Sequence, residues 1–105
     1  MSGLGDMGNL LRQAQEMQRE MDKARAEVSA ARVNGTAGGG AVSVELDGDG
    51  MVLRVTIAPD ADLSDRSMLE DLMLAALRDG IGRATRLREE RLSKVTGGLN
   101  LPGLF

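Results

Sequence analysis

The chain has 105 residues, a formal net charge of −3, and neither cysteine nor histidine. This length fits one domain or one subunit of a dimer, and the missing residue types exclude thiolate nucleophiles, imidazole bases, disulfides, zinc fingers and haem ligation. Since the remaining carboxylates show no sign of an apolar cleft that would separate their pKa values, we expect no enzyme, no small-molecule substrate, no metal site and no cofactor.

The sequence also lacks the marks of a membrane or exported protein. No apolar run approaches the roughly 18 residues that span a bilayer, and the first residues lack the basic start and apolar core of a secretory signal. We therefore expect a cytoplasmic protein with no membrane partner.

A long amphipathic helix is predicted over about 7–31, with Asp6 or Asn9 as its N-cap. Its apolar residues recur every 3.5 residues on average, which is typical of a coiled-coil seam. The seam is on the order of 33 Å long at about 1.5 Å per residue, too long to be covered wholly by the rest of a small chain. We therefore predict a homodimer. Its predicted interface consists of Leu10, Ala14, Met17, Met21, Ala24 and Val28.

A small antiparallel sheet of three strands is expected over about 32–58. A short strand around Val33 leads to a flexible reversal at residues 38–40. Residues 41–47 and 51–58 then alternate apolar and polar side chains on either side of a turn at residues 47–50, which predicts a β-hairpin. The first hairpin strand is expected to bury Val42, Val44 and Leu46, and the second to align Met51, Leu53, Val55 and Ile57.

A second long helix is predicted over about 67–95, with Ser67 as N-cap and Glu70 completing a capping box. Gly80 and Gly82 indicate either a kink or close helix crossing, or a tolerated weakening of an exposed stretch. Beyond Gly82 apolar positions thin out, so this half is expected to project outward or to pair with a partner, followed by an irregular tail over 96–105. The first half is expected to cover the sheet with Leu69, Leu72, Met73, Ala76, Leu77 and Ile81.

Charge is distributed unevenly along the chain. Residues 78–94 carry six basic and three acidic side chains, whereas residues 41–71 are strongly acidic. Such asymmetry points to a partner, although mixed charges on a helix usually form a solvated face. Because Phe105 is the single aromatic residue, the chain has no stacking platform for unpaired bases, and any nucleic-acid partner is expected to be a duplex.

The order and spacing of several short segments closely resemble the YbaB/EbfC family of bacterial nucleoid-associated proteins. These segments are Gly8-Asn9-Leu10-Leu11, Gln13-Ala14-Gln15, Met17-Gln18, Val33 with Gly35, Met68-Leu69-Glu70-Asp71-Leu72 and Gly97-Gly98-Leu99-Asn100-Leu101-Pro102-Gly103. The resemblance covers nearly the whole chain and implies a single α+β domain over 1–105. It also implies a tweezer-like homodimer whose helical arms bind double-stranded DNA in the nucleoid, with a role in nucleoid organisation or gene regulation.

Matching positions on the two helices leads us to predict contacts between basic residues and DNA phosphates. The predicted DNA-binding residues are Arg12, Arg19, Lys23, Arg25, Arg83, Arg86, Arg88, Arg91 and Lys94. Acidic residues interleaved among them would weaken attraction to DNA. The alternative is a dimeric protein-interaction module on the same fold, with weak or no DNA binding.

Overall fold

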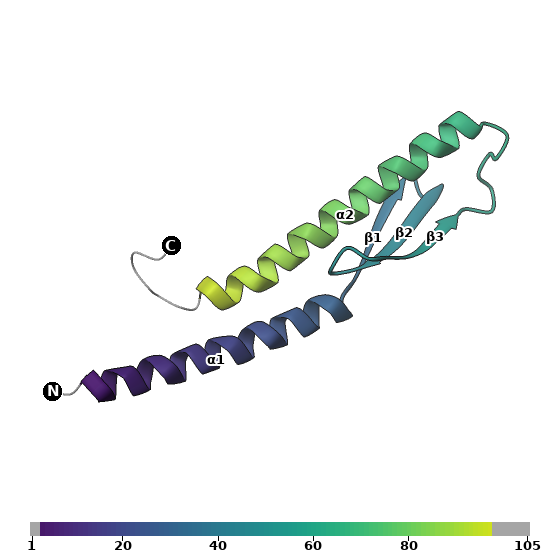
Figure 1. Ribbon diagram of the computed structural model, residues 1–105. Helices are drawn as coiled ribbons and strands as arrows, with labels where there is room; N and C mark the ends of the chain where they lie inside the picture. Colours follow the sequence, from purple (N-terminus) through teal and green to yellow (C-terminus); the bar gives the residue numbers. More distant parts are fainter. Residues whose placement is uncertain (1–2, 98–105) are drawn as a thin grey trace.

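The computed structural model describes residues 3–97, which form two long helices and a three-stranded antiparallel sheet (Figure 1). The elements follow in the order α1 (Gly3–Ala30), β1 (Arg32–Ala37), β2 (Val42–Asp47), β3 (Val52–Ile57) and α2 (Arg66–Gly97). This confirms the predicted α+β fold. Residues 96 and 97 belong to α2 and not to the predicted tail, of which the remainder, 98–105, lies outside the described residues.

The first half of α2 lies over the sheet, and its second half continues alongside α1 (Figure 1). We call α1 together with residues 82–97 of α2 the helical arm. The second half of α2 therefore projects beyond the sheet (Figure 1), which is one of the two predicted alternatives, and it packs against α1 of the same chain.

The core forms where β2 meets α2. Val42, Val44 and Leu46 are fully buried, as predicted, and pack with Ala76. The strand order is β1-β2-β3, so β2 is central and β3 is an edge strand. The predicted apolar row of β3 is correct only at Ile57 and Val55, which pair with Val42 and Val44.

A register shift at residues 45–46 of β2 changes the rest of that row. Glu45 pairs with Arg54, but Leu46 pairs with Val52 and not with Leu53. The predicted continuation to Leu53 and Met51 is therefore wrong, because one residue of β3 is left unpaired at the bulge and the side-chain alternation shifts by one position.

Helix α2 approaches the sheet closely at Gly80. A Cβ atom added to Gly35 of β1 would overlap the backbone of Ala76 and Gly80, so the two glycines allow strand and helix to touch. The predicted close crossing of two helices is therefore wrong at Gly80, where the close approach is between a helix and a strand. The buried positions of α2 are Ala76, Gly80 and Ala84, spaced by four, whereas Ile81 is exposed, contrary to prediction.

The helix ends differ from the predicted caps. Helix α2 begins at Arg66, and the Asp65 carboxylate accepts a hydrogen bond from the Met68 amide at 3.0 Å. Asp65 is therefore the N-cap and the prediction of Ser67 is wrong. Helix α1 begins at Gly3, so neither Asp6 nor Asn9 caps it.

The hairpin turn at residues 47–50 anchors the base of α1. Asp47 Oδ1 accepts hydrogen bonds from the amides of Asp49 and Met51 at 2.9 and 3.0 Å, which confirms the predicted turn. The Gly48 amide donates to the Val28 carbonyl at 3.0 Å, and Ser29 Oγ donates to Asp49 Oδ2 at 2.7 Å. The sheet thus fixes the end of α1 from which the arm extends.

The apolar seam of α1 becomes more exposed along the helix. Ala24 and Val28 are buried within the chain and Met17 is half-buried, but Leu10 is 60% exposed. The chain thus covers the seam only near the sheet. Ala24 and Val28 already have partners within the chain, so the intermolecular seam stays a prediction, and its exposed members in the described chain are Leu10 and Ala14.

Candidate nucleic-acid interface

The structure brings all nine predicted DNA-binding residues onto the helical arm. Arg12, Arg19, Lys23 and Arg25 lie on α1, and Arg83, Arg86, Arg88, Arg91 and Lys94 lie on the part of α2 beside it. The two helices run in opposite directions along the arm (Figure 1). The basic residues that are widely separated in sequence therefore share one elongated element.

Three of these basic residues form ion pairs, and for two of them the carboxylate also belongs to the arm. Arg91 Nη1 lies 3.1 Å from Glu27 Oε2 and joins α2 to α1, and Arg19 Nη2 lies 3.3 Å from Glu16 Oε1 within α1. All four side chains are substantially exposed to solvent. Exposed pairs of this kind contribute about 0–1 kcal/mol, so their basic members can exchange a carboxylate for a phosphate at little cost.

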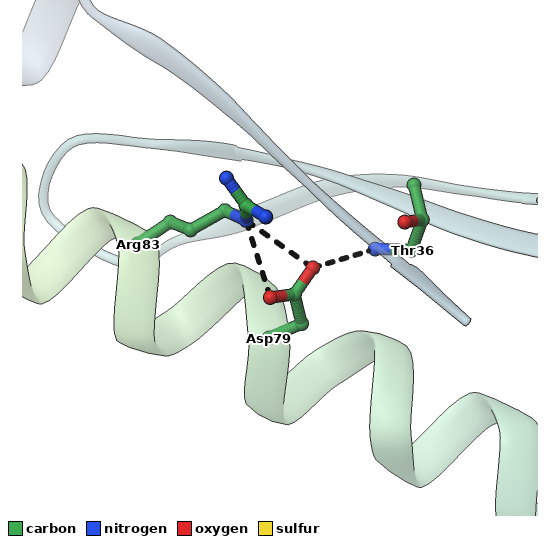
Figure 2. A network of polar contacts seen from close by, with 3 residues as sticks. All are labelled: Thr36, Asp79 and Arg83. Atoms are coloured by element: carbon green, nitrogen blue, oxygen red, sulfur yellow. Dashed lines mark hydrogen bonds and ion pairs between the residues drawn. The ribbon is translucent and has the colours of Figure 1, made fainter.

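Arg83 is held more elaborately, by Asp79 (Figure 2). Its Nε donates to both Asp79 carboxylate oxygens, at 3.1 and 3.2 Å, and Asp79 Oδ2 also accepts a hydrogen bond from the Thr36 amide of β1 at 3.0 Å. The Thr36 amide, and after it Arg83, lowers the pKa of Asp79. This network was not predicted from the sequence. The spacing of four residues between Asp79 and Arg83 could have indicated their ion pair, but not the hydrogen bond from Thr36.

A groove runs between the two helices of the arm, with a larger hollow of about 660 Å³ and a smaller one of about 330 Å³ that shares Glu20, Lys94 and Val95 with it. We call this the arm groove. The groove is lined by Asn9, Arg12, Gln13, Glu16, Met17, Glu20, Lys23, Ala24, Glu27, Arg91, Lys94 and Val95. Its four basic and three acidic side chains nearly balance, so the groove attracts an anion only weakly at long range.

Five of the predicted basic residues have neither an ion pair nor a side-chain hydrogen bond within residues 3–97. They are Arg12, Lys23, Arg25, Arg86 and Lys94. Arg12, Lys23 and Lys94 line the arm groove. Arg88 donates only a long hydrogen bond of 3.5 Å, to the carbonyl of Asp49.

Two neutral polar residues of the groove were not predicted as site residues. Asn9 and Gln13 are four residues apart on α1 and line the groove beside Arg12. Their amide groups can donate hydrogen bonds to phosphate oxygens without adding charge. Their spacing of four residues places Asn9 and Gln13 on one face of the helix, and this spacing could have identified them from the sequence. Within the described range, neither helix is long and apolar enough to cross a membrane.

Comparison with known proteins identifies one family, several relatives and a solved structure that resemble this chain. The YbaB/EbfC DNA-binding family matches residues 3–99. A nucleoid-associated protein of Alkaliphilus metalliredigens is 39% identical over 106 aligned positions, covering 100% of this chain and 93% of the relative. A nucleoid-associated protein of Chloroflexus aurantiacus is 46% identical over 97 residues, covering 91% and 95% respectively. The crystal structure of an uncharacterised Helicobacter pylori protein has the same fold, with a TM-score of 0.73 and 24% identity over 92% of this chain and 100% of that one.

Proposed function

The chain belongs to the YbaB/EbfC DNA-binding family, and from this premise we propose that it is a nucleoid-associated protein whose homodimer contacts the backbone of duplex DNA through the helical arm. The observation that carries this proposal is the match to the family over residues 3–99, which include the whole arm. The names of the two nucleoid-associated relatives support a location in the nucleoid, and hence in the cytoplasm. We propose a binding role without catalysis.

The basic residues of the arm support backbone contact. Within residues 3–97, Arg12, Lys23 and Lys94 have no carboxylate to release, and they line one groove, so they are the first candidates for phosphate contacts. Arg19 and Arg91 join them once their exposed ion pairs with glutamates open. Side chains of this kind bind phosphate regardless of sequence, which is the behaviour expected of a protein that organises DNA broadly.

The exposed face of β3 supports the homodimer. Ile57, Val55 and Val52 pair with the buried residues of β2 and therefore continue the apolar core row, yet they are 38–43% exposed. Within residues 3–97 α2 does not contact β3, and β3 also has one free edge (Figure 1). A free edge beside an uncovered apolar row is a surface that proteins normally cover. We therefore propose β3 as the principal dimer contact.

The elongated shape of the chain agrees with this assignment. Its radius of gyration is 20.8 Å and its extents are 77 × 24 × 15 Å. A compact domain of this length has a radius of gyration of about 13 Å. A single chain thus has little interior of its own, and a second copy on β3 would enlarge the core.

A charge placed on the uncovered row tests the dimer. Val55→Asp is expected to convert a dimer into a monomer at micromolar concentration in sedimentation velocity. Thr56→Asp is the matched control because Thr56 pairs with Ser43, in the alternate row of the sheet, and should leave the dimer intact. A wild-type chain that sediments as a folded monomer would contradict the homodimer, and a dimeric Val55→Asp variant would contradict the β3 interface.

Charge reversal on the arm tests DNA binding. Replacing Arg12, Lys23 and Lys94 by Glu is expected to abolish retardation of a duplex at low salt. The control replaces Arg54, Arg66 and Arg78 by Glu, which changes the net charge equally outside the helical arm. If both triple variants bind DNA equally, the arm is not the binding surface.

The nearly balanced charge of the arm groove is the one observation that favours the second candidate, a dimeric module that binds another protein. That alternative predicts no retardation of duplex DNA by the wild-type protein even at low salt. The same titration therefore separates the two functions.

A further inference from the structure

The tip of the arm exposes a cluster of large apolar side chains. Met7, Leu10 and Leu11 are 63%, 60% and 65% exposed, and we call them the apolar tip. Leu10 belongs to the same helix stripe as Met17 and Ala24, because the three residues are spaced by seven. Along this stripe the side chains pass from exposed to half-buried to 6% exposed. Within residues 3–97, the stripe is therefore covered near the sheet and exposed to solvent at the tip of the arm.

The cover ends because α2 ends. Val95 lines the arm groove together with Asn9, Gln13 and Met17, and α2 stops two residues later at Gly97. The last described residue of α2, to which residues 98–105 are joined, is therefore close to the apolar tip. Eight extended residues reach about 26 Å, whereas Leu10 lies only about 10 Å along the helix from Met17. The segment is long enough to cover the tip.

The composition of residues 98–105 matches that surface. The segment contains Leu99, Leu101, Leu104 and Phe105 and no charged residue. Segments that remain in solvent are typically polar or charged and poor in aromatic residues. The only aromatic side chain of the protein thus lies in a short apolar segment that begins beside an uncovered apolar surface.

We propose that residues 98–105 dock on the apolar tip of the same chain and complete the cover of α1. Residues 98–105 of the same chain are favoured over those of a second copy, because the covalent link to α2 keeps them within reach of the tip and so gives them a high effective concentration. This docking does not depend on DNA binding. In this arrangement the apolar stripe of α1 is covered along the whole arm, by α2 near the sheet and by residues 98–105 at the tip.

Disulfide trapping tests this docking in the full-length protein, which has no cysteine of its own. The test pair is Ala14→Cys with Asn100→Cys, since Ala14 is exposed and lies next to Leu10 and Leu11 on the helix. The control pair is Arg19→Cys with Asn100→Cys, because Arg19 lies about 140° around the helix from Ala14. After mild oxidation with diamide, the test pair should form an intrachain disulfide at least about fivefold more than the control pair.

Equal yields from the two pairs would overturn the proposal. A disulfide that joins two chains would also overturn it and would assign the apolar tip to a second copy. Hydrogen exchange gives an independent measurement with Leu101→Ser, Leu104→Ser and Phe105→Ser combined, and with Asn100→Ser as control. Exchange over residues 7–16 should become at least about threefold faster in the triple variant alone, and unchanged exchange would overturn the docking.

Discussion

Replacing Glu27 by Gln removes the carboxylate that holds Arg91 at 3.1 Å across the arm. The pair is exposed, with side chains 46% and 43% accessible, so its loss should lower the free energy of unfolding by only about 0–1 kcal/mol. The change also frees Arg91 for a phosphate and removes one negative charge from the arm groove. We therefore expect Glu27→Gln to strengthen DNA binding while leaving the fold intact.

The expected size follows from the number of phosphates contacted. A homodimer gains two freed arginines, and each phosphate contact steepens the slope of log affinity against log salt by about 0.9, so the slope should steepen by about 1.8. Across a fourfold range of salt, from about 50 to 200 mM, this corresponds to an additional change in affinity of about tenfold.

Fluorescence anisotropy with a labelled duplex of about two helical turns, titrated at three salt concentrations, measures this slope. Glu70→Gln is the control, because Glu70 is an exposed carboxylate in the part of α2 that lies outside the helical arm. If the slopes of the Glu27→Gln variant and the wild-type protein are equal, releasing Arg91 from Glu27 adds no phosphate contact, and the predicted gain is refuted. If Glu70→Gln steepens the slope as much, only the net charge of the protein matters.

Two further predictions concern the packing that positions the arm. Gly35→Ala should lower the free energy of unfolding by about 2 kcal/mol or more, because the added methyl group overlaps the backbone of α2. Gly82→Ala should raise the free energy of unfolding by up to about 1 kcal/mol, because a methyl group there meets only the Arg86 side chain, at 3.6 Å. Urea denaturation at one protein concentration measures both, and equal effects would contradict the close approach of α2 to β1. Asp79→Asn should destabilise the protein at neutral pH. Because the pKa of Asp79 is lowered below 3.8 on folding, this difference should shrink as the pH falls below 3.8, and a difference independent of pH would exclude a role for the carboxylate charge.

Local patterns predicted most of the fold. The alternation in β2 correctly identified Val42, Val44 and Leu46 as core, because a strand with one covered face must place its apolar residues at every second position. The reversal after β1 was also correct: Gly38, Gly39 and Gly40 all adopt positive φ angles. Such features depend on a few neighbouring residues and are therefore readable from the sequence.

The predictions that failed depend on contacts between distant or competing groups. Asp65 and Ser67 are both suitable N-caps two residues apart, and the path of the loop before α2 selects Asp65. The sequence also could not show that Ala24 and Val28 of the α1 seam are covered within the chain, because the elements that cover them come later in the sequence. The intermolecular seam itself stays a prediction. The bulge in β3 likewise has no local signature.

The candidate site shows the same division. The sequence identified the basic residues of both helices but could not show which of them are paired, since the partner of Arg91 is 64 residues away at Glu27. The structure therefore ranks the nine residues. Among the described residues, Arg12, Lys23 and Lys94 have no partner and line the groove, and Arg83 is the most firmly held. Their contacts with DNA stay predictions.

Titration of the wild-type protein with duplex DNA at low and physiological salt tests the central claim most directly. Contact through unpaired arm cations predicts binding that is insensitive to sequence and falls steeply with salt. If only Arg12, Lys23 and Lys94 of each copy contribute, the slope of log affinity against log salt should be about −5. No binding at low salt, or an affinity that does not change with salt, would contradict the account.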